Sequence, residues 1–224
     1  MMSAFTLHTT ATAPATSNPS SADLRTAFKT FEKAHIHAFI RQWLTEGVPA
    51  IFAPQPFLYE DLRNWMGMRF KVSQKCFSLL GSARFGYSLT KNDFGKPFNP
   101  SSDLDLACVD SGFFMICMTE AQRWGREFDA GKVVPTSDLQ RKYWPENRRQ
   151  LDQHIDRGFI QTDRIPAMDS YPKLQDVLNS MSLIPNKLKI TPNAPKVSKA
   201  SLRVYRDWDA LTAQVTLNLR AALL

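Results

Sequence analysis

The fold is set by the apolar stretch Cys76-Phe77-Ser78-Leu79-Leu80-Gly81-Ser82 and by a second stretch, Ser101-Ser102-Asp103-Leu104-Asp105-Leu106-Ala107-Cys108-Val109. The first stretch ends in a Gly-Ser turn, and the second alternates acidic with apolar residues. Because successive strand side chains point to opposite faces, the two acids share one face and the two leucines share the other. The sequence therefore predicts two strands, with paired carboxylates at the start of the second.

The acidic pair and the turn each favour a particular ligand. The carboxylates of Asp103 and Asp105 repel each other unless a cation lies between them, and hard oxygen ligands of this kind suit Mg²⁺. A turn such as Gly81-Ser82 at the end of a strand can hold a phosphate through backbone N–H groups and a hydroxyl. The two stretches together predict a site for a metal ion and a phosphate.

This pattern resembles the nucleotidyltransferase superfamily, to which DNA polymerase beta belongs. The family signature is an apolar strand, Gly-Ser or Gly-Gly, a spacer, and Asp-h-Asp-h on the next strand, where h is apolar. It is matched by 77–82 and 103–106, and the resemblance covers roughly residues 70–110. The arrangement of these residues also resembles, at the level of the family, minimal bacterial nucleotidyltransferases from toxin–antitoxin or phage-defence settings. The resemblance implies an α/β (α+β) nucleotidyltransferase fold, with a small mixed sheet, flanking helices and one face covered by helices.

The same resemblance implies a reaction and roles for the site residues. A nucleoside monophosphate moves from a nucleoside triphosphate, ATP among them, to an acceptor hydroxyl, and pyrophosphate leaves. Asp103 and Asp105 would bridge two Mg²⁺ ions, while Gly81 and Ser82 would hold the β- and γ-phosphates. Arg84 would either add a cation for the triphosphate or form a structural salt bridge. The acceptor stays open between RNA, a protein and other hydroxyl compounds.

Two features depart from the family pattern. The spacer from Ala83 to Ser102 has 20 residues, longer than usual, and its turn-rich part 94–100 indicates an inserted loop. The third acid that the family places within a later strand is also not found. Asp207 is the nearest candidate, and we expect both Asp207 and Asp110 to cap the helices that follow them. Two hypotheses stay open: an active Mg²⁺-dependent nucleotidyltransferase, or an inactive relative that binds nucleotide, RNA or a protein partner.

Composition narrows the class of protein. The chain has 224 residues and a net charge of +7, which favours encounter with polyanions such as nucleotides or RNA. The basic patches are Arg141-Lys142 with Arg148-Arg149, and the basic residues of 187–206. A weaker hypothesis is an RNA-binding adaptor that uses this C-terminal segment. P-loop, G-x-S-x-G and G-x-G-x-x-G motifs do not occur.

The sequence further predicts no membrane partner and a cytoplasmic location. No apolar stretch approaches the ~20 residues that span a bilayer, and the N-terminus does not have the pattern of a secretory signal. Three cysteines without C-x-x-C spacing, Cys76, Cys108 and Cys117, favour buried thiols over a disulfide or a zinc site.

Periodicity and turn residues predict the remaining elements. We expect a flexible leader over 1–20 and a single domain over 21–224. Its helices are predicted at 22–45 with a Ser20 or Ser21 cap, near 57–65, at 111–129, at 137–144 and 146–157 with Pro145 in a first turn, from 174 to before Pro185, and at 209–223. A short extended segment is predicted at 158–160 and a third long strand at 200–205.

Overall fold

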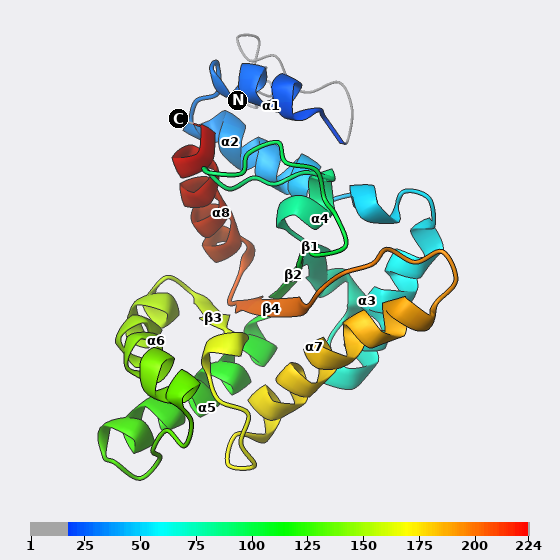
Figure 1. The fold of residues 1–224 in the computed structure, drawn as a ribbon. Coiled ribbons are helices and arrows are strands. Elements are labelled where there is room, and N and C mark those ends of the chain that lie inside the picture. Colours follow the sequence, from blue (N-terminus) through cyan, green and yellow to red (C-terminus); the bar gives the residue numbers. More distant parts are fainter. Residues whose placement is uncertain (1–17, 224) are drawn as a thin grey trace, which may run out of the picture.

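The computed structural model describes residues 18–223, so most of the predicted leader lies outside the described residues. A four-stranded mixed sheet runs through the protein in the order β1-β2-β4-β3 (Figure 1). Its strands are β1 Phe77–Leu79, β2 Leu104–Val109, β3 Phe159–Gln161 and β4 Ala200–Tyr205. The central pair β2 and β4 is parallel, whereas β1 and β3 run antiparallel to their neighbours. The prediction of a small mixed sheet with flanking helices is confirmed.

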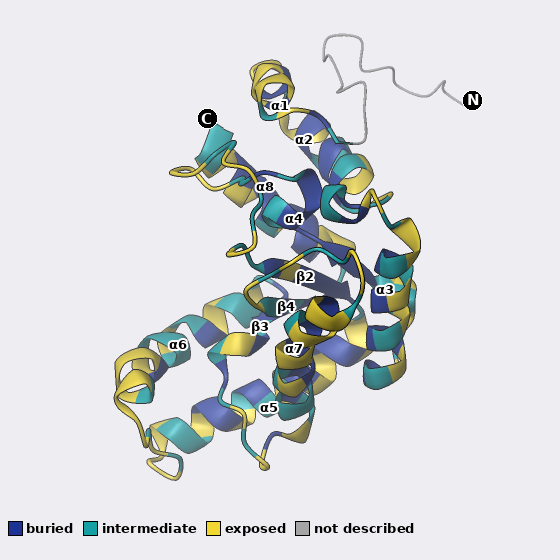
Figure 2. Ribbon diagram, turned by 45° about the vertical axis from the view of Figure 1, so that its right-hand side comes forward, coloured by how far each residue is buried: buried dark blue, intermediate teal, exposed yellow. Residues whose placement is uncertain are grey.

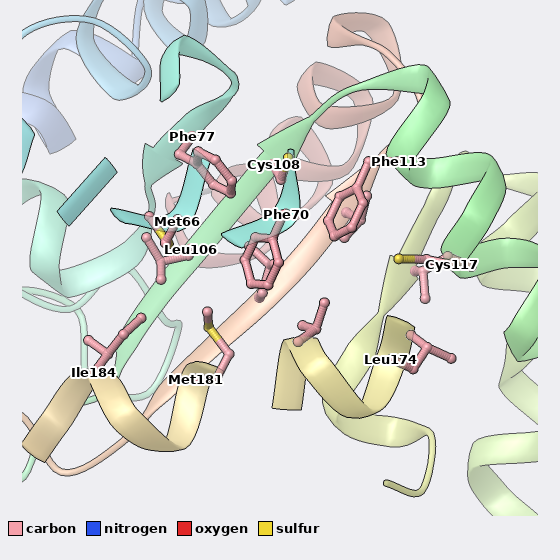
Figure 3. Close-up of a cluster of buried hydrophobic side chains, with 14 of the residues drawn as sticks. Met66, Phe70, Phe77, Leu106, Cys108, Phe113, Cys117, Leu174, Met181 and Ile184 are labelled. Carbon is pink, nitrogen blue, oxygen red and sulfur yellow. The ribbon is translucent and has the colours of Figure 1, made fainter. Parts of the chain in front are cut away.

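The first face of the sheet carries the larger of two apolar cores. Leu104, Leu106 and Cys108 of β2 alternate onto this face, with Leu202 and Val204 of β4 beside them. Four helices cover it: α3 Pro56–Phe70, α5 Ser111–Asp129, α6 Asp138–Asp156 and α7 Pro172–Ile190. Figure 3 shows side chains from α3, α5 and α7 converging on the β2 residues. The leucines of β2 therefore point into the core, as the alternation in the sequence predicts.

The second face is covered by helices from the two ends of the described chain. These are α1 Ser21–Phe28, α2 Lys33–Phe39, the π-helical turn Ile40–Leu44 and α8 Trp208–Leu223. They pack on Ala107, Val109 and Tyr205, the residues that alternate away from the first core. Figure 1 shows α2 and α8 on one side of the sheet and α5 and α7 on the other. The expectation that helices cover one face was thus wrong, because apolar alternation continues on the second face beyond Asp105.

The predicted helix over 22–45 is interrupted. The N-cap of α1 is Ser20, as expected, but the helix ends at Phe28. The Thr30 hydroxyl donates to the carbonyl oxygen of Ala27 at 2.9 Å, and Glu32 and His35 form a reciprocal capping box that starts α2. These local side-chain bonds satisfy backbone groups at the end of α1 and the start of α2, so the chain can break the helix there. The apolar spacing that predicted one helix runs through both.

Two prolines lie inside helices that were predicted to stop or restart beside them. Pro145 lies within α6, which runs unbroken from Asp138 to Asp156, and Pro185 lies within α7. Proline removes one backbone donor from a helix, yet Trp144 and Ile184 beside these prolines are buried in the core. Tertiary packing therefore outweighs the local preference for a helix end.

Short elements complete the chain. They are the 3₁₀ turns Ala50–Phe52, Gln74–Cys76 and Thr162–Arg164, and the single-turn helix α4 Gly81–Phe85 directly after β1. All three cysteines are free thiols, and Cys108 and Cys117 are buried. The prediction of a buried thiol is confirmed for Cys108 but was wrong for Cys76, which is partly buried because it lies in the turn before β1. Within residues 18–223, every helix is too short or too polar to cross a membrane. Figure 2 shows burial concentrated on the sheet and on the inner sides of the helices.

Candidate metal and phosphate site

The Gly-Ser turn lies directly against the first carboxylate of β2. The main-chain N–H of Leu80 donates to the carbonyl oxygen of Asp105 at 2.9 Å, which extends the β1–β2 pairing by one residue. Gly81 then turns the chain with φ +60°, and a Cβ atom there would lie 3.3 Å from Oδ2 of Asp105. Glycine is therefore favoured at this position both by the left-handed backbone and by the closeness of the carboxylate.

Asp103 lies one residue before β2 and is already engaged. Its Oδ1 accepts a 2.7 Å hydrogen bond from the Ser198 hydroxyl, and its Oδ2 lies 3.1 Å from Nζ of Lys199. The carboxylate raises the pKa of Lys199, first through the hydrogen bond and then through its charge. Both partners come from the segment that enters β4, so the parallel pairing of β2 with β4 brings them to Asp103.

The neighbouring strand carries no acid at the site. Asp105 is paired in register with Ser201, whose hydroxyl donates to Oδ1 of Asp105 at 2.9 Å. Arg203 follows two residues later on the same face of β4. Asp207 lies beyond the strand, where its Oδ1 accepts a 2.7 Å bond from the N–H of Ala210 and caps α8. A third carboxylate is thus absent from the described residues of β4.

The other acid considered as a third ligand is also a cap. Oδ1 of Asp110 accepts a 2.7 Å hydrogen bond from the backbone N–H of Phe113, at the start of α5. It follows β2 at the end of the strand opposite to Asp105. Both cap predictions are confirmed.

Two adjoining pockets open at the carboxylates. The sheet pocket, of about 440 Å³, lies between the second face of the sheet and α8, and includes Leu80, Leu89, Arg203, Val215 and Asn218. The loop pocket, of about 310 Å³, lies under the 83–102 spacer and includes both carboxylates. The two pockets share a set of polar residues: Ser82, Ser88, Thr90 and Asp105. A phosphate group at Ser82 would have an apolar-walled space on one side and a polar one on the other.

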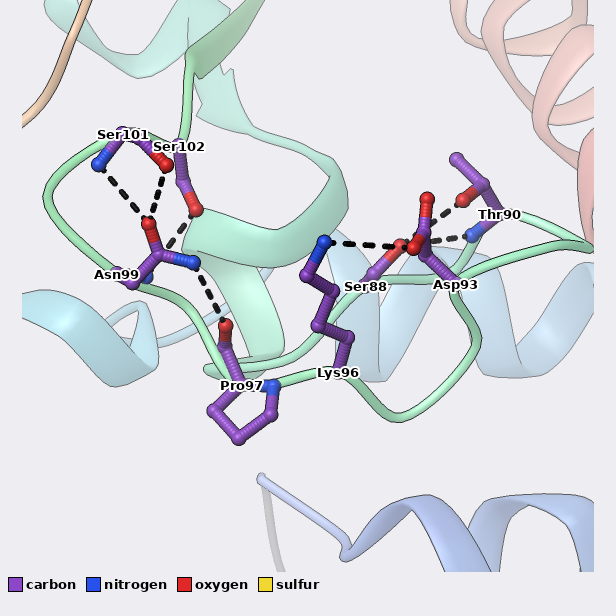
Figure 4. Close-up of polar contacts among 8 residues, drawn as sticks. All are labelled: Ser88, Thr90, Asp93, Lys96, Pro97, Asn99, Ser101 and Ser102. Atoms are coloured by element: carbon purple, nitrogen blue, oxygen red, sulfur yellow. Dashed lines mark hydrogen bonds and ion pairs between the residues drawn. The ribbon is translucent and has the colours of Figure 1, made fainter.

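The long spacer folds into a closed loop that walls the loop pocket. Ser88 exchanges two backbone hydrogen bonds across the loop, donating to the carbonyl of Lys96 at 2.8 Å and accepting from the N–H of Gly95 at 2.9 Å. Figure 4 shows the Lys96 ammonium directed at Asp93, 3.4 Å away, and Asn99 accepting from Ser101. The loop is therefore ordered by its own polar contacts, as the turn-rich sequence of 94–100 suggests.

Arg84 points away from both pockets. Its side chain is 1% exposed, and its guanidinium donates to the carbonyl oxygens of Leu44, Glu46 and Val48 at 3.0, 2.7 and 3.2 Å. A fourth bond, of 2.7 Å, goes to Oδ1 of Asn18. Arg84 thus links α4 to the end of the π-helical turn and the segment that follows it. The sequence predicted either a contact with the triphosphate or a salt bridge, and Arg84 instead binds backbone carbonyl oxygens.

The residues present fit a Mg²⁺ ion that is only partly held by protein. Asp103 and Asp105 supply hard oxygen ligands, and Mg²⁺ commonly binds through one or two carboxylates, with water and substrate phosphates completing its shell. Within residues 18–223, no group of three or more His, Cys, Asp or Glu side chains is placed to hold a metal ion. A metal ion would therefore depend on phosphate oxygens as well as on the two carboxylates.

Another pocket lies away from the carboxylates. It has a volume of about 550 Å³ and is found near the opposite end of β2, between Thr45, Arg63, Cys76 and Trp208. Its arginine is already paired with Glu60, with 3.5 Å between Nη1 and Oε2. Size alone does not identify a site, and we favour the smaller pockets because their carboxylates and hydroxyls converge.

The predicted residues Gly81, Ser82, Asp103 and Asp105 are brought together, whereas Arg84 is not. The sequence did not identify Ser198 or Ser201 as site residues, and it placed Lys199 and Arg203 only in a basic segment. Residues 201 and 203 lie on the same face of the predicted strand 200–205. This spacing is the sequence signal that could have grouped Ser201 with Arg203. No family model, curated protein or solved structure matches this chain.

Proposed function

We propose that the protein is a Mg²⁺-dependent nucleotidyltransferase that transfers a nucleoside monophosphate from a nucleoside triphosphate to an acceptor hydroxyl. The observation that supports the proposal is the contact between the Gly-Ser turn and the carboxylate of β2: Gly81 lies against Asp105, and Ser82 lines both pockets with it. A nucleotidyltransferase fold is part of the same proposal, since the Gly-Ser turn directly follows β1 and Asp105 lies on the neighbouring strand β2.

In this proposal the chain mainly positions charged groups. The Ser82 hydroxyl and nearby backbone N–H groups hold the phosphates, and the two carboxylates hold Mg²⁺, which would neutralise phosphate charge and activate the acceptor oxygen. The acceptor oxygen forms a bond to the α-phosphorus, the bond from that phosphorus to the bridging oxygen breaks, and pyrophosphate leaves. The acceptor proton passes to solvent.

A second candidate, a non-catalytic nucleotide-binding module, is favoured by one observation. The strand position opposite Asp105 is Ser201, and Asp103 is ion-paired with Lys199. Both features lower the number of negative charges available to a metal ion. Such a module would bind the magnesium–triphosphate complex without releasing pyrophosphate.

The experiment incubates purified protein with Mg²⁺, labelled nucleoside triphosphates and a panel of RNA, DNA and protein acceptors. We expect labelled product and pyrophosphate, and their loss in Asp105→Asn and Asp103→Asn. The matched control is Asp93→Asn, which removes an acid from the same loop pocket without touching the carboxylate pair. Equal turnover in Asp105→Asn and wild type would refute the catalytic role.

Calorimetry separates the two candidates. Magnesium–triphosphate binding that depends on Asp105, together with no product on any acceptor, would favour the non-catalytic module. If the wild-type protein does not bind the magnesium–triphosphate complex, both candidate functions are refuted.

A further inference from the structure

A row of cationic groups leads from the sheet pocket across the sheet. Arg203 lies in that pocket with Asp105, and its register partner on β3 is Gln161. Arg157 precedes β3, and its guanidinium carbon lies 5.7 Å from the centre of the Phe159 ring. Neither arginine forms an ion pair with a carboxylate in the part of the chain that the structure describes, residues 18–223.

A half-buried histidine near the end of α6, His154, lies within reach of the charges of both arginines. The imidazole of His154 lies 4.6 Å from the Phe159 ring, centre to centre. Burial and, after it, the charges of Arg164, Arg157 and Arg203 together lower the pKa of His154 to about 4. The three arginines each lower this pKa and no carboxylate raises it, which agrees with an excess of positive charge close to His154.

We propose that Arg203 and Arg157 bind the phosphate backbone of a single-stranded nucleic acid whose terminal hydroxyl reaches the carboxylates at Asp105. The statement that the terminal hydroxyl is the acceptor rests on the proposed function. The binding of the strand by the two arginines does not depend on it.

The spread of the cations favours a strand over the triphosphate alone. The sheet order β1-β2-β4-β3 places the Gly-Ser turn, Asp105, Arg203 and then β3 in sequence across the sheet. Three strand spacings correspond to about 14 Å. Because β3 is the strand farthest from the Gly-Ser turn, we expect a triphosphate held at Ser82 not to extend to Arg157, whereas the repeated phosphates of a strand could contact both arginines. The net charge of +7 favours the same class of partner.

The test measures binding of short fluorescent single strands, one of RNA and one of DNA with the same sequence, without metal or triphosphate and over a range of salt concentrations. We expect Arg157→Gln and Arg203→Gln each to weaken binding several-fold and to lower the slope of log affinity against log salt by about 0.7. Arg157→Lys keeps the charge and is expected to keep the slope. The matched control is Arg141→Gln, at the other end of α6, where the arginine pairs with Asp138.

Three outcomes would overturn the proposal. They are unchanged binding in both glutamine variants, an equal loss in Arg141→Gln, and a loss of inorganic triphosphate binding in Arg157→Gln while strand binding is kept. The Asp105→Asn variant distinguishes this inference from the proposed function, because it should bind the strand normally even though transfer is lost.

Discussion

Oδ2 of Asp105 lies 3.3 Å from the position that a Cβ atom would occupy at Gly81. The Gly-Ser turn therefore lies so close to the carboxylate that a methyl group at position 81 would crowd it. The contact joins a residue at the end of β1 to one on β2, and it exists because the Leu80 N–H pairs with the Asp105 carbonyl.

Gly81→Ala should impair both stability and ligand binding. Its φ of +60° costs a residue with a side chain roughly 1–2 kcal/mol, and the added methyl group would push against the Asp105 carboxylate. The control is Gly131→Ala, where φ is +68° but no atom lies within 4 Å of the new Cβ. Urea unfolding should show a loss in both variants that is somewhat larger in Gly81→Ala, with weaker magnesium–triphosphate binding only in Gly81→Ala. Equal ligand binding in the two variants would contradict the site.

Ser201→Asp should strengthen metal binding. The Ser201 hydroxyl lies 2.9 Å from Oδ1 of Asp105, so a carboxylate at this position would add a third acid to the pair. We expect Mg²⁺ affinity to rise about tenfold by calorimetry, because affinity follows the number of charged ligands. In the absence of metal the variant should be less stable than Ser201→Asn, owing to repulsion between carboxylates. An unchanged Mg²⁺ affinity would argue that Asp105 does not bind metal.

Arg84→Met should destabilise the protein without a specific effect on triphosphate. The substitution removes the donors that Arg84 supplies to the carbonyl oxygens of Leu44, Glu46 and Val48. Because a buried acceptor left unpaired costs about 1–3 kcal/mol, we expect a loss of about 3 kcal/mol or more in urea unfolding. Arg141→Met, at an exposed ion pair, should lose less than about 1 kcal/mol. A stable Arg84→Met protein with weakened triphosphate binding would place Arg84 in the phosphate site instead.

His154 should make stability depend on pH in the acidic range. Its pKa is about 4 in the folded protein against 6.5 in the unfolded reference, so the unfolded chain binds the proton more tightly between these values. The contribution is present above pH 6.5 and is lost as the pH falls toward 4. Because the imidazole is only half-buried, we expect a loss of about 1–2 kcal/mol after allowing for solvent screening. Urea unfolding at several pH values should show a shallower decline in His154→Gln, and an identical decline would exclude this cause.

Several features of the site could be read from the sequence because they depend on neighbouring residues. Alternation along 103–109 placed the acids and the leucines on opposite faces, and the spacing of Asp110 and Asp207 from the following helices predicted their caps. The strand at 200–205 was also predicted with its correct limits. Periodicity and capping act over a few residues, so the chain reports them directly.

Tertiary structure decided which distant residues meet. Ser201 lies 96 residues from the carboxylate it contacts, and only the β2–β4 register determines that it, and not an acid, stands opposite Asp105. Burial determined that Arg84 binds backbone carbonyls.

The sequence by itself determined the local pieces: the Gly-Ser turn, the acidic pair and the capped helices. Only the packed sheet decided that the turn touches Asp105, that Lys199 pairs with Asp103, and that Arg203 faces the pocket. The physical reason is that strand register is chosen by the burial of whole faces, which sums contributions from segments far apart in the chain.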